Sequence, residues 1–250
     1  MNYKKEFNKV EKNFHEFKVR VISSKISLDR FYLDIDPILV IKELSEISNP
    51  EKLEKTIFVW PEGIIPGVSQ EELIQYQDLF IKNFSEHHIL IIGINNQYTK
   101  NGTKTFFNSL NVYDNNLNIL ETYNKIKLVP FGEFLPYEKI LKKIGLRSIT
   151  NNYQSFTSGD KRNIIEIKKS NFSFKFLPLI CYEIIYSGKL FEDSKFEYII
   201  NISEDGWFGQ SIGPKQHFVH SLFRAIESGK YVLRSANNGI AAIVNPLGVV

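Results

Sequence analysis

The chain has 250 residues, of which 43% are hydrophobic and 24% charged, and its formal net charge is +3. This length and balance predict a globular protein with a sizeable core, and they exclude a wholly disordered chain. The basic residues are scattered rather than gathered into a stripe, which argues against a nucleic-acid binder. A single cysteine excludes an internal disulfide framework and a cysteine-rich zinc module.

Neither a membrane-spanning segment nor a targeting signal is expected from the sequence. No run of about 18 or more apolar residues is present, so nothing predicts a transmembrane helix. The first residues lack an apolar core segment and do not predict a signal peptide. Residues 1–17 alternate charged and aromatic side chains, which predicts a charged lead-in segment or surface helix before a domain at residues 18–250.

The first half of the chain alternates strand and helix patterns. Apolar spacing predicts, in chain order, a strand at 18–23, a helix at 36–47, a strand at 57–60, a helix at 69–84 and a strand at 89–94. Ser69 and Glu72 form a capping-box pattern, which favours a helix that begins at Ser69.

The second half mixes hairpins with further strands and one helix. We expect a hairpin of strands 105–113 and 117–123, a strand pair at 163–168 and 172–180, a strand at 198–202, a helix at 216–228 that ends at Gly229, and strands at 231–235 and 240–244. Strand–helix alternation combined with hairpins predicts a layered α/β domain with one or two mixed sheets.

Three segments place a reactive side chain at the end of a predicted strand, namely Glu62, Lys125 and Cys181. Taken alone, each has an ordinary interpretation as a turn acid, a solvated lysine and a small core residue. Together they allow nucleophilic catalysis, in which Glu62 is the general base, Lys125 stabilises the oxyanion and the thiolate, and Cys181 is the nucleophile. Glu133 and Glu183 are candidates for carboxylates that orient the site or serve the structure.

The five histidines are weaker candidates. His87 and His88 close a predicted helix, His217 and His220 lie three positions apart on another, and His15 lies in the lead-in. No carboxylate or cysteine completes a metal-ligand pattern with them, so we expect surface or packing roles and no metal site.

The flanks of the three candidate residues resemble a known family. The strings are YNKIKLVPFGEFLP at 123–136, LPLICYE at 177–183, DGWFG at 205–209 and RAIESGKYVLRSANNGI at 224–240. They are similar to the nitrilase superfamily of carbon–nitrogen hydrolases and acyltransferases and, within it, to the apolipoprotein N-acyltransferases. The resemblance runs from about Val19 to the end of the chain.

The resemblance implies an α-β-β-α sandwich and a Glu62–Lys125–Cys181 triad. It also implies that Glu133 and Glu183 support the triad, and that Tyr182 and Trp207 line an acyl pocket. The implied reaction moves a fatty acyl chain from a phospholipid, through a cysteine thioester, to the N-terminal amine of a diacylglyceryl-cysteine lipoprotein, with no cofactor. The family's domain faces the periplasm and lies among inner-membrane helices.

The sequence departs from the family in two respects. The family's domain continues through further strands into a membrane helix, so we expect a C-terminally truncated domain that is either isolated or the product of a split gene. The Phe31–Tyr32 pair lies near a position where the family often has tryptophan. Two alternatives stay open: a soluble nitrilase-type amidase that acts on small amides, and a catalytically silent remnant.

Overall fold

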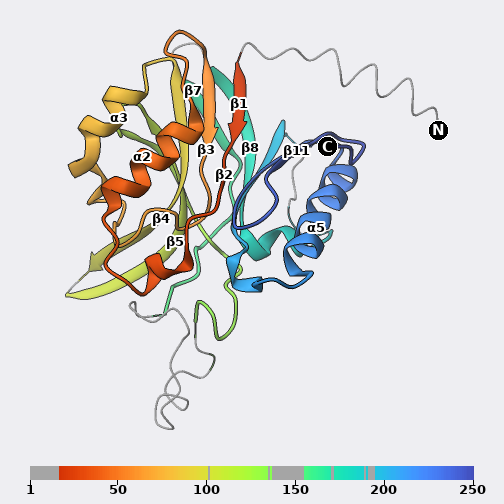
Figure 1. The fold of residues 1–250 in the computed structure, drawn as a ribbon. Coiled ribbons are helices and arrows are strands. Elements are labelled where there is room, and N and C mark those ends of the chain that lie inside the picture. The colour runs from red at the N-terminus through yellow and green to blue at the C-terminus, as the bar shows by residue number, and fades with distance from the viewer. Residues whose placement is uncertain are drawn as a thin grey trace.

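Two β-sheets form the centre of the molecule in the computed structural model (Figure 1). The structure describes residues 17–100, 102–134, 136, 155–169, 172–188, 190 and 195–250. Residues 1–16 of the predicted lead-in segment, and Ser170 and Asn171 of a predicted turn, lie outside this set.

The first sheet contains the strands of the N-terminal half. Its order is β1-β3-β4-β5-β6, with β1, β3 and β4 parallel and with β5 and β6 added as antiparallel strands. The bounds are Lys18–Val21 for β1, Thr56–Val59 for β3, His88–Lys100 for β4, Thr103–Asp114 for β5 and Ile119–Asn124 for β6. The predicted hairpin is therefore the β5–β6 pair, and β4 is longer than the predicted strand.

The second sheet contains the strands of the C-terminal half. Its order is β11-β10-β9-β8-β7, and the short β2 pairs in parallel with β10. The bounds are Ser23–Ser24 for β2, Ile165–Lys169 for β7, Phe172–Ile180 for β8, Tyr198–Glu204 for β9, Tyr231–Asn237 for β10 and Ala242–Val244 for β11. The strands β8, β9 and β10 are parallel, so their carboxyl ends lie at one edge.

Helices cover the outer face of each sheet. The helices α2 (Pro37–Ser48) and α3 (Gln77–Asn83) lie on the first sheet, and α5 (Gly213–Ser228) lies on the second (Figure 1). Four short 3₁₀ helices join the described elements: η1 (Leu28–Phe31), η2 (Leu73–Tyr76), η4 (Cys181–Ile185) and η5 (Gly206–Phe208). The order helix–sheet–sheet–helix confirms the predicted α-β-β-α sandwich.

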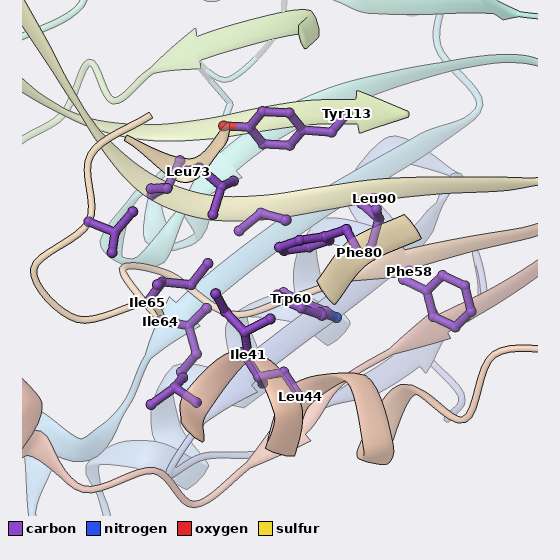
Figure 2. Close-up of a cluster of buried hydrophobic side chains, with 14 of the residues drawn as sticks. Ile41, Leu44, Phe58, Trp60, Ile64, Ile65, Leu73, Phe80, Leu90 and Tyr113 are labelled. Atoms are coloured by element: carbon purple, nitrogen blue, oxygen red, sulfur yellow. The ribbon is translucent and has the colours of Figure 1, made fainter. Parts of the chain in front are cut away.

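Alternation along β3 shows how the sequence builds these layers. Ile57 and Val59 belong to the apolar cluster between the sheets, whereas Phe58 and the following Trp60 belong to the cluster under α2 and α3. A strand buried on both faces carries such a continuous apolar run because successive side chains point to opposite faces. Figure 2 shows Trp60 among the side chains of this outer cluster, and its indole Nε1 donates to Ser48 Oγ at 2.9 Å.

The helix predicted to begin at Ser69 is wrong in its first part. Ser69 forms an isolated β-bridge with Asn95, and Glu72 Oε2 accepts from both Ser69 N and Ser69 Oγ at 2.9 Å. The capping-box pair therefore closes a turn beside β4, because the bridge keeps Ser69 in extended pairing. Helical structure begins at Leu73 as η2 and continues from Gln77 as α3.

Among the described residues, no helix is both long enough and apolar enough to span a membrane.

Candidate active site

The candidate residues meet where strands of both sheets end. Glu62 follows β3, Lys125 follows β6, and Cys181 follows β8. Layered α/β folds place their sites at such strand ends, because the loops there are positioned by a rigid scaffold.

Lys125 lies between two carboxylates. Its Nζ is 3.2 Å from Glu62 Oε1 and 3.0 Å from Glu133 Oε1, and all three side chains are buried. Burial alone would lower the pKa of Lys125, but Glu133, Glu62 and Cys181 outweigh it and hold that pKa well above its usual value. The lysine is therefore a fixed positive charge in a site where the two carboxylates leave a net negative balance.

Asn108 on β5 bridges the same two carboxylates. Its Nδ2 donates to Glu62 Oε1 at 2.7 Å and to Glu133 Oε1 at 2.6 Å, and its backbone carbonyl oxygen accepts from Lys125 N at 2.8 Å. The donors Lys125 Nζ and Asn108 Nδ2 thus alternate with the acceptors Glu62 Oε1 and Glu133 Oε1 around a closed ring of four hydrogen bonds. Asn108 was not among the residues predicted from the sequence. The only signal was a polar residue inside a predicted strand of a hairpin.

The turn that carries Glu62 requires a glycine on the neighbouring strand. A Cβ added at Gly93 of β4 would lie 2.4 Å from Pro61 O and 2.5 Å from Glu62 Cα. Only a residue without a side chain lets the two backbones approach so closely. Glu62 is held from the other side as well, because its Oε2 accepts from Glu204 N at 3.0 Å.

Cys181 opens η4 in a left-handed conformation, with φ at +49°. Such a conformation is uncommon for a residue other than glycine and is found at functional turns. Burial raises the pKa of the Cys181 thiol above its usual value, Glu62 raises it further, and Lys125 opposes them. The thiol is consequently protonated at neutral pH and needs a base to become a nucleophile.

Glu183 ties the Cys181 turn to the loop after Lys125. It is fully buried, and its carboxylate accepts hydrogen bonds from five donor groups: Tyr123 Oη, Ile126 N, Lys127 N, Arg162 Nη2 and Ile180 N. It does not line the cavity described below. Of the two interpretations left open by the sequence, this geometry favours the structural one.

Replacing Glu183 by glutamine is expected to destabilise the protein. Glutamine has one acceptor oxygen in place of two and leaves the Arg162 guanidinium, now 2.6 Å from the carboxylate, without its counter-charge. Breaking a buried ion pair from one side costs about 3–5 kcal/mol. Urea unfolding of E183Q beside the wild type measures this loss. An unchanged midpoint would show that the contacts of Glu183 do not hold the two loops together.

A cavity of about 1080 Å³ leads to Cys181. Glu62, Lys125, Glu133 and Cys181 lie on its walls, together with many apolar side chains. Its volume is at the upper end of the range for small-molecule pockets.

Tyr182 and Trp207 both lie on the walls of this cavity. Trp207 is 43% exposed and stacks on Phe31, with ring centroids 5.2 Å apart. Phe31 lies on the same cavity wall. The cavity therefore has an aromatic wall that reaches solvent.

A second buried cluster lies behind Cys181 and was not predicted. The imidazole of His217 lies between Asp205 and the Cys181 carbonyl, and Asp205 is held by Arg234. From the sequence, His217 was expected to be a surface or packing residue. The described residues contain no group of three or more His, Cys, Asp or Glu side chains suited to a metal ion.

Comparison with known sequences gives two kinds of similarity. Residues 41–250 match the model of the carbon-nitrogen hydrolase family. Apolipoprotein N-acyltransferase of Brucella suis is 36% identical over 198 residues, which covers 77% of this chain and 36% of that protein. The protein of the same name from Allorhizobium ampelinum is 30% identical over 237 residues, covering 92% of this chain and 44% of that protein. The chain thus spans less than half the length of these relatives.

Solved structures share the fold at low sequence identity. A member of branch 10 of the nitrilase superfamily from Saccharomyces cerevisiae has a TM-score of 0.60 at 16% identity, covering 92% of this chain and 82% of that one. An amidase from Nesterenkonia, which carries an acetamide moiety at its active-site cysteine, has a TM-score of 0.57 at 12% identity, with the same coverage. Because the family model covers most of the sequence, the chain belongs to the carbon-nitrogen hydrolase family.

Proposed function

We propose that this chain is the catalytic domain of an apolipoprotein N-acyltransferase, which transfers a fatty acyl chain through a thioester on Cys181. The observation that carries the proposal is the large, partly apolar cavity that ends on Cys181 beside the Glu62–Lys125–Glu133 cluster. The similarity to relatives named apolipoprotein N-acyltransferase supports the choice of substrates.

The first half-reaction forms the acyl-enzyme. Glu62 takes the proton of the Cys181 thiol, and the sulfur attacks the carbonyl carbon of a phospholipid ester. Lys125 stabilises the resulting oxyanion, joined by the backbone N–H of Tyr182, which lies in the first turn of η4 where helical N–H groups have no partner within the helix. The ester C–O bond then breaks, and Glu62 returns the proton to the departing lysophospholipid oxygen.

The second half-reaction transfers the acyl group. The α-amino group of a diacylglyceryl-cysteine lipoprotein attacks the thioester carbon and gives a proton to Glu62. The C–S bond breaks, and the Cys181 sulfur takes the proton back as thiol. Every step is an acid–base or acyl-transfer step, so the mechanism needs no cofactor.

The cavity walls support a lipid substrate that enters from a membrane surface. Tyr32, Leu33, Trp207 and Phe208 line the cavity, and between 41% and 62% of each residue is exposed. Large exposed apolar side chains gathered at one opening mark a contact with lipid or with another apolar partner. We propose that this opening works at the periplasmic face of the inner membrane, and that Tyr182 and Trp207 contact the acyl chain.

The test is the intact mass of the protein after incubation with phosphatidylethanolamine in detergent micelles. We expect an adduct of one acyl mass that hydroxylamine removes and that Cys181→Ala lacks. Release of ammonia from small amides, without an acyl adduct from phospholipid, would instead identify an amidase. If a natively folded sample performs neither reaction, both the acyltransferase and the amidase are contradicted, and a catalytically silent remnant is favoured.

A further inference from the structure

We propose that His217 is the positioning residue that sets the conformation of the Cys181 turn, an inference that rests on the proposed role of Cys181 as nucleophile. His217 lies on α5, and its side chain is buried between α5 and the carboxyl ends of β8 and β9. It approaches the nucleophile from the backbone side, whereas Glu62 and Lys125 act on the thiol electrostatically.

The contact with the nucleophile is made to its carbonyl group. His217 Nε2 lies 3.2 Å from Cys181 O, and Asn201 Nδ2 lies 3.5 Å from the same oxygen. A carbonyl oxygen only accepts, so this contact is a hydrogen bond only with a proton on Nε2, and the contact of Nδ1 with the Asp205 carboxylate likewise needs a proton on Nδ1. Since Cys181 has φ at +49°, a conformation that costs about 1–3 kcal/mol, bonds from its surroundings have to maintain it.

Fixing this carbonyl also fixes the oxyanion donor. Cys181 C=O and Tyr182 N–H belong to one planar, trans peptide unit, so they point in opposite directions. Rotation of that plane would turn the Tyr182 N–H away from the place where the oxyanion forms. His217 therefore controls, through the peptide plane, a group that the proposed reaction uses in both half-reactions.

His217 is itself held by a buried charge cluster. Its Nδ1 lies 2.8 Å from Asp205 Oδ1, and Arg234 Nη2 lies 3.0 and 2.8 Å from the two carboxylate oxygens of Asp205. Burial would raise the pKa of Asp205, but His217 and Arg234 outweigh it and hold that pKa below its usual value. The imidazole thus has an anionic anchor behind it.

The same carboxylate is also fixed by a neighbouring hydroxyl group. Ser203 Oγ donates to Asp205 Oδ1 at 2.7 Å. Asp205 is therefore linked to the Cys181 backbone through His217 and is itself held by Ser203 and Arg234.

Two substitutions separate the contacts of His217. In His217→Gln the amide nitrogen is separated from Cγ by one atom, as Nε2 is, and keeps a donor for Cys181 O. In His217→Asn the amide nitrogen is attached to Cγ, as Nδ1 is, and keeps only the donor for Asp205. His220→Asn is the matched control, because His220 lies on the same helix outside the cavity walls.

We expect H217N to form the acyl-enzyme about 100-fold more slowly than the wild type, because a small displacement of a reacting group costs about 100-fold in rate. The acylation rates of H217Q and H220N should stay within about tenfold of the wild-type rate. Alkylation of Cys181 by iodoacetamide, read by intact mass, is unambiguous because the chain has one cysteine. The pH profile of the alkylation rate in H217Q should overlay that of the wild type, whereas the profile in H217N should differ from it. Thermal melting verifies that each variant is folded.

A wild-type acylation rate and alkylation profile in H217N would overturn the proposal, and so would equal losses in folded H217Q and H217N. Long-range ¹H–¹⁵N NMR of histidine-labelled wild type tests the contact without any variant, since an unprotonated Nε2 on His217 would also overturn it. Absence of an acyl adduct in the wild type would contradict the proposed function alone, because the NMR and alkylation measurements do not need acyl transfer.

Discussion

Replacing Lys125 by methionine is expected to abolish detectable acyl-enzyme formation and to destabilise the fold. Methionine fills similar space but removes the charge that lies 3.2 Å from Glu62 and 3.0 Å from Glu133. Loss of an oxyanion-stabilising group costs about 100- to 1000-fold in rate. Removing one partner from a buried ionic cluster costs about 3–5 kcal/mol, because the two carboxylates then face each other with only Asn108 as a shared donor.

Lys127→Met is the matched control for this substitution. Lys127 lies two positions away in the same loop but is exposed, so its replacement should change neither the acylation rate nor the melting temperature appreciably. Normal acyl-enzyme formation by folded K125M would defeat the role assigned to Lys125. Equal losses of acylation rate and melting temperature in K127M would show that these properties depend on the loop in general and not on the buried charge of Lys125.

Replacing Glu62 by glutamine is expected to change two reactions of Cys181 in opposite directions. Acyl-enzyme formation should fall by about 100- to 10,000-fold, because the general base is gone. Alkylation by iodoacetamide at neutral pH should become faster, because the Glu62 carboxylate is one of the causes that raise the pKa of the Cys181 thiol. Each pKa unit by which the thiol falls increases the thiolate fraction about tenfold.

The pH dependence gives the sign of this effect. In the wild type, alkylation should be slow at neutral pH and climb only in the alkaline range, because burial and Glu62 both keep the thiol protonated. In E62Q the same curve should shift to lower pH. Glu43→Gln, which removes an exposed carboxylate on α2, should leave the curve in place. An unshifted curve in E62Q, or undiminished acylation, would remove Glu62 from the proposed mechanism.

Local sequence patterns predicted most of the strands because their information lies within a few residues. The alternation in β3 and the turn between β5 and β6 are of this kind, and both lie where expected. The Ser69–Glu72 pair shows the limit. Glu72 Oε2 accepts from Ser69 N as the capping pattern requires, yet Ser69 Oγ does not accept from Glu72 N, and pairing of Ser69 with β4 overrides the helix. Tertiary pairing of this sort has no local signal.

The candidate site was predictable where a residue followed a strand and stood in a recognisable string, as Glu62, Lys125 and Cys181 do. Asn108 and His217 could not be found in that way. Asn108 contacts a carboxylate 46 positions away, and His217 contacts the carbonyl of a residue 36 positions away. Their roles depend on which strand ends the fold brings together, and single residue types in a strand or helix do not encode that.

The two sheets divide the proposed reaction centre between them. Glu62, Lys125 and Asn108 come from the first sheet or the loops that follow its strands, and Cys181 comes from the second. A genetic crossover between Glu133 and β7 would thus pair the base and the lysine of one parent with the nucleophile of another. In a chimera joined there, residues from one parent contact residues from the other within the reaction centre. Homologous recombination therefore preserves the chemistry only where the reaction-centre residues of the two parents fit together.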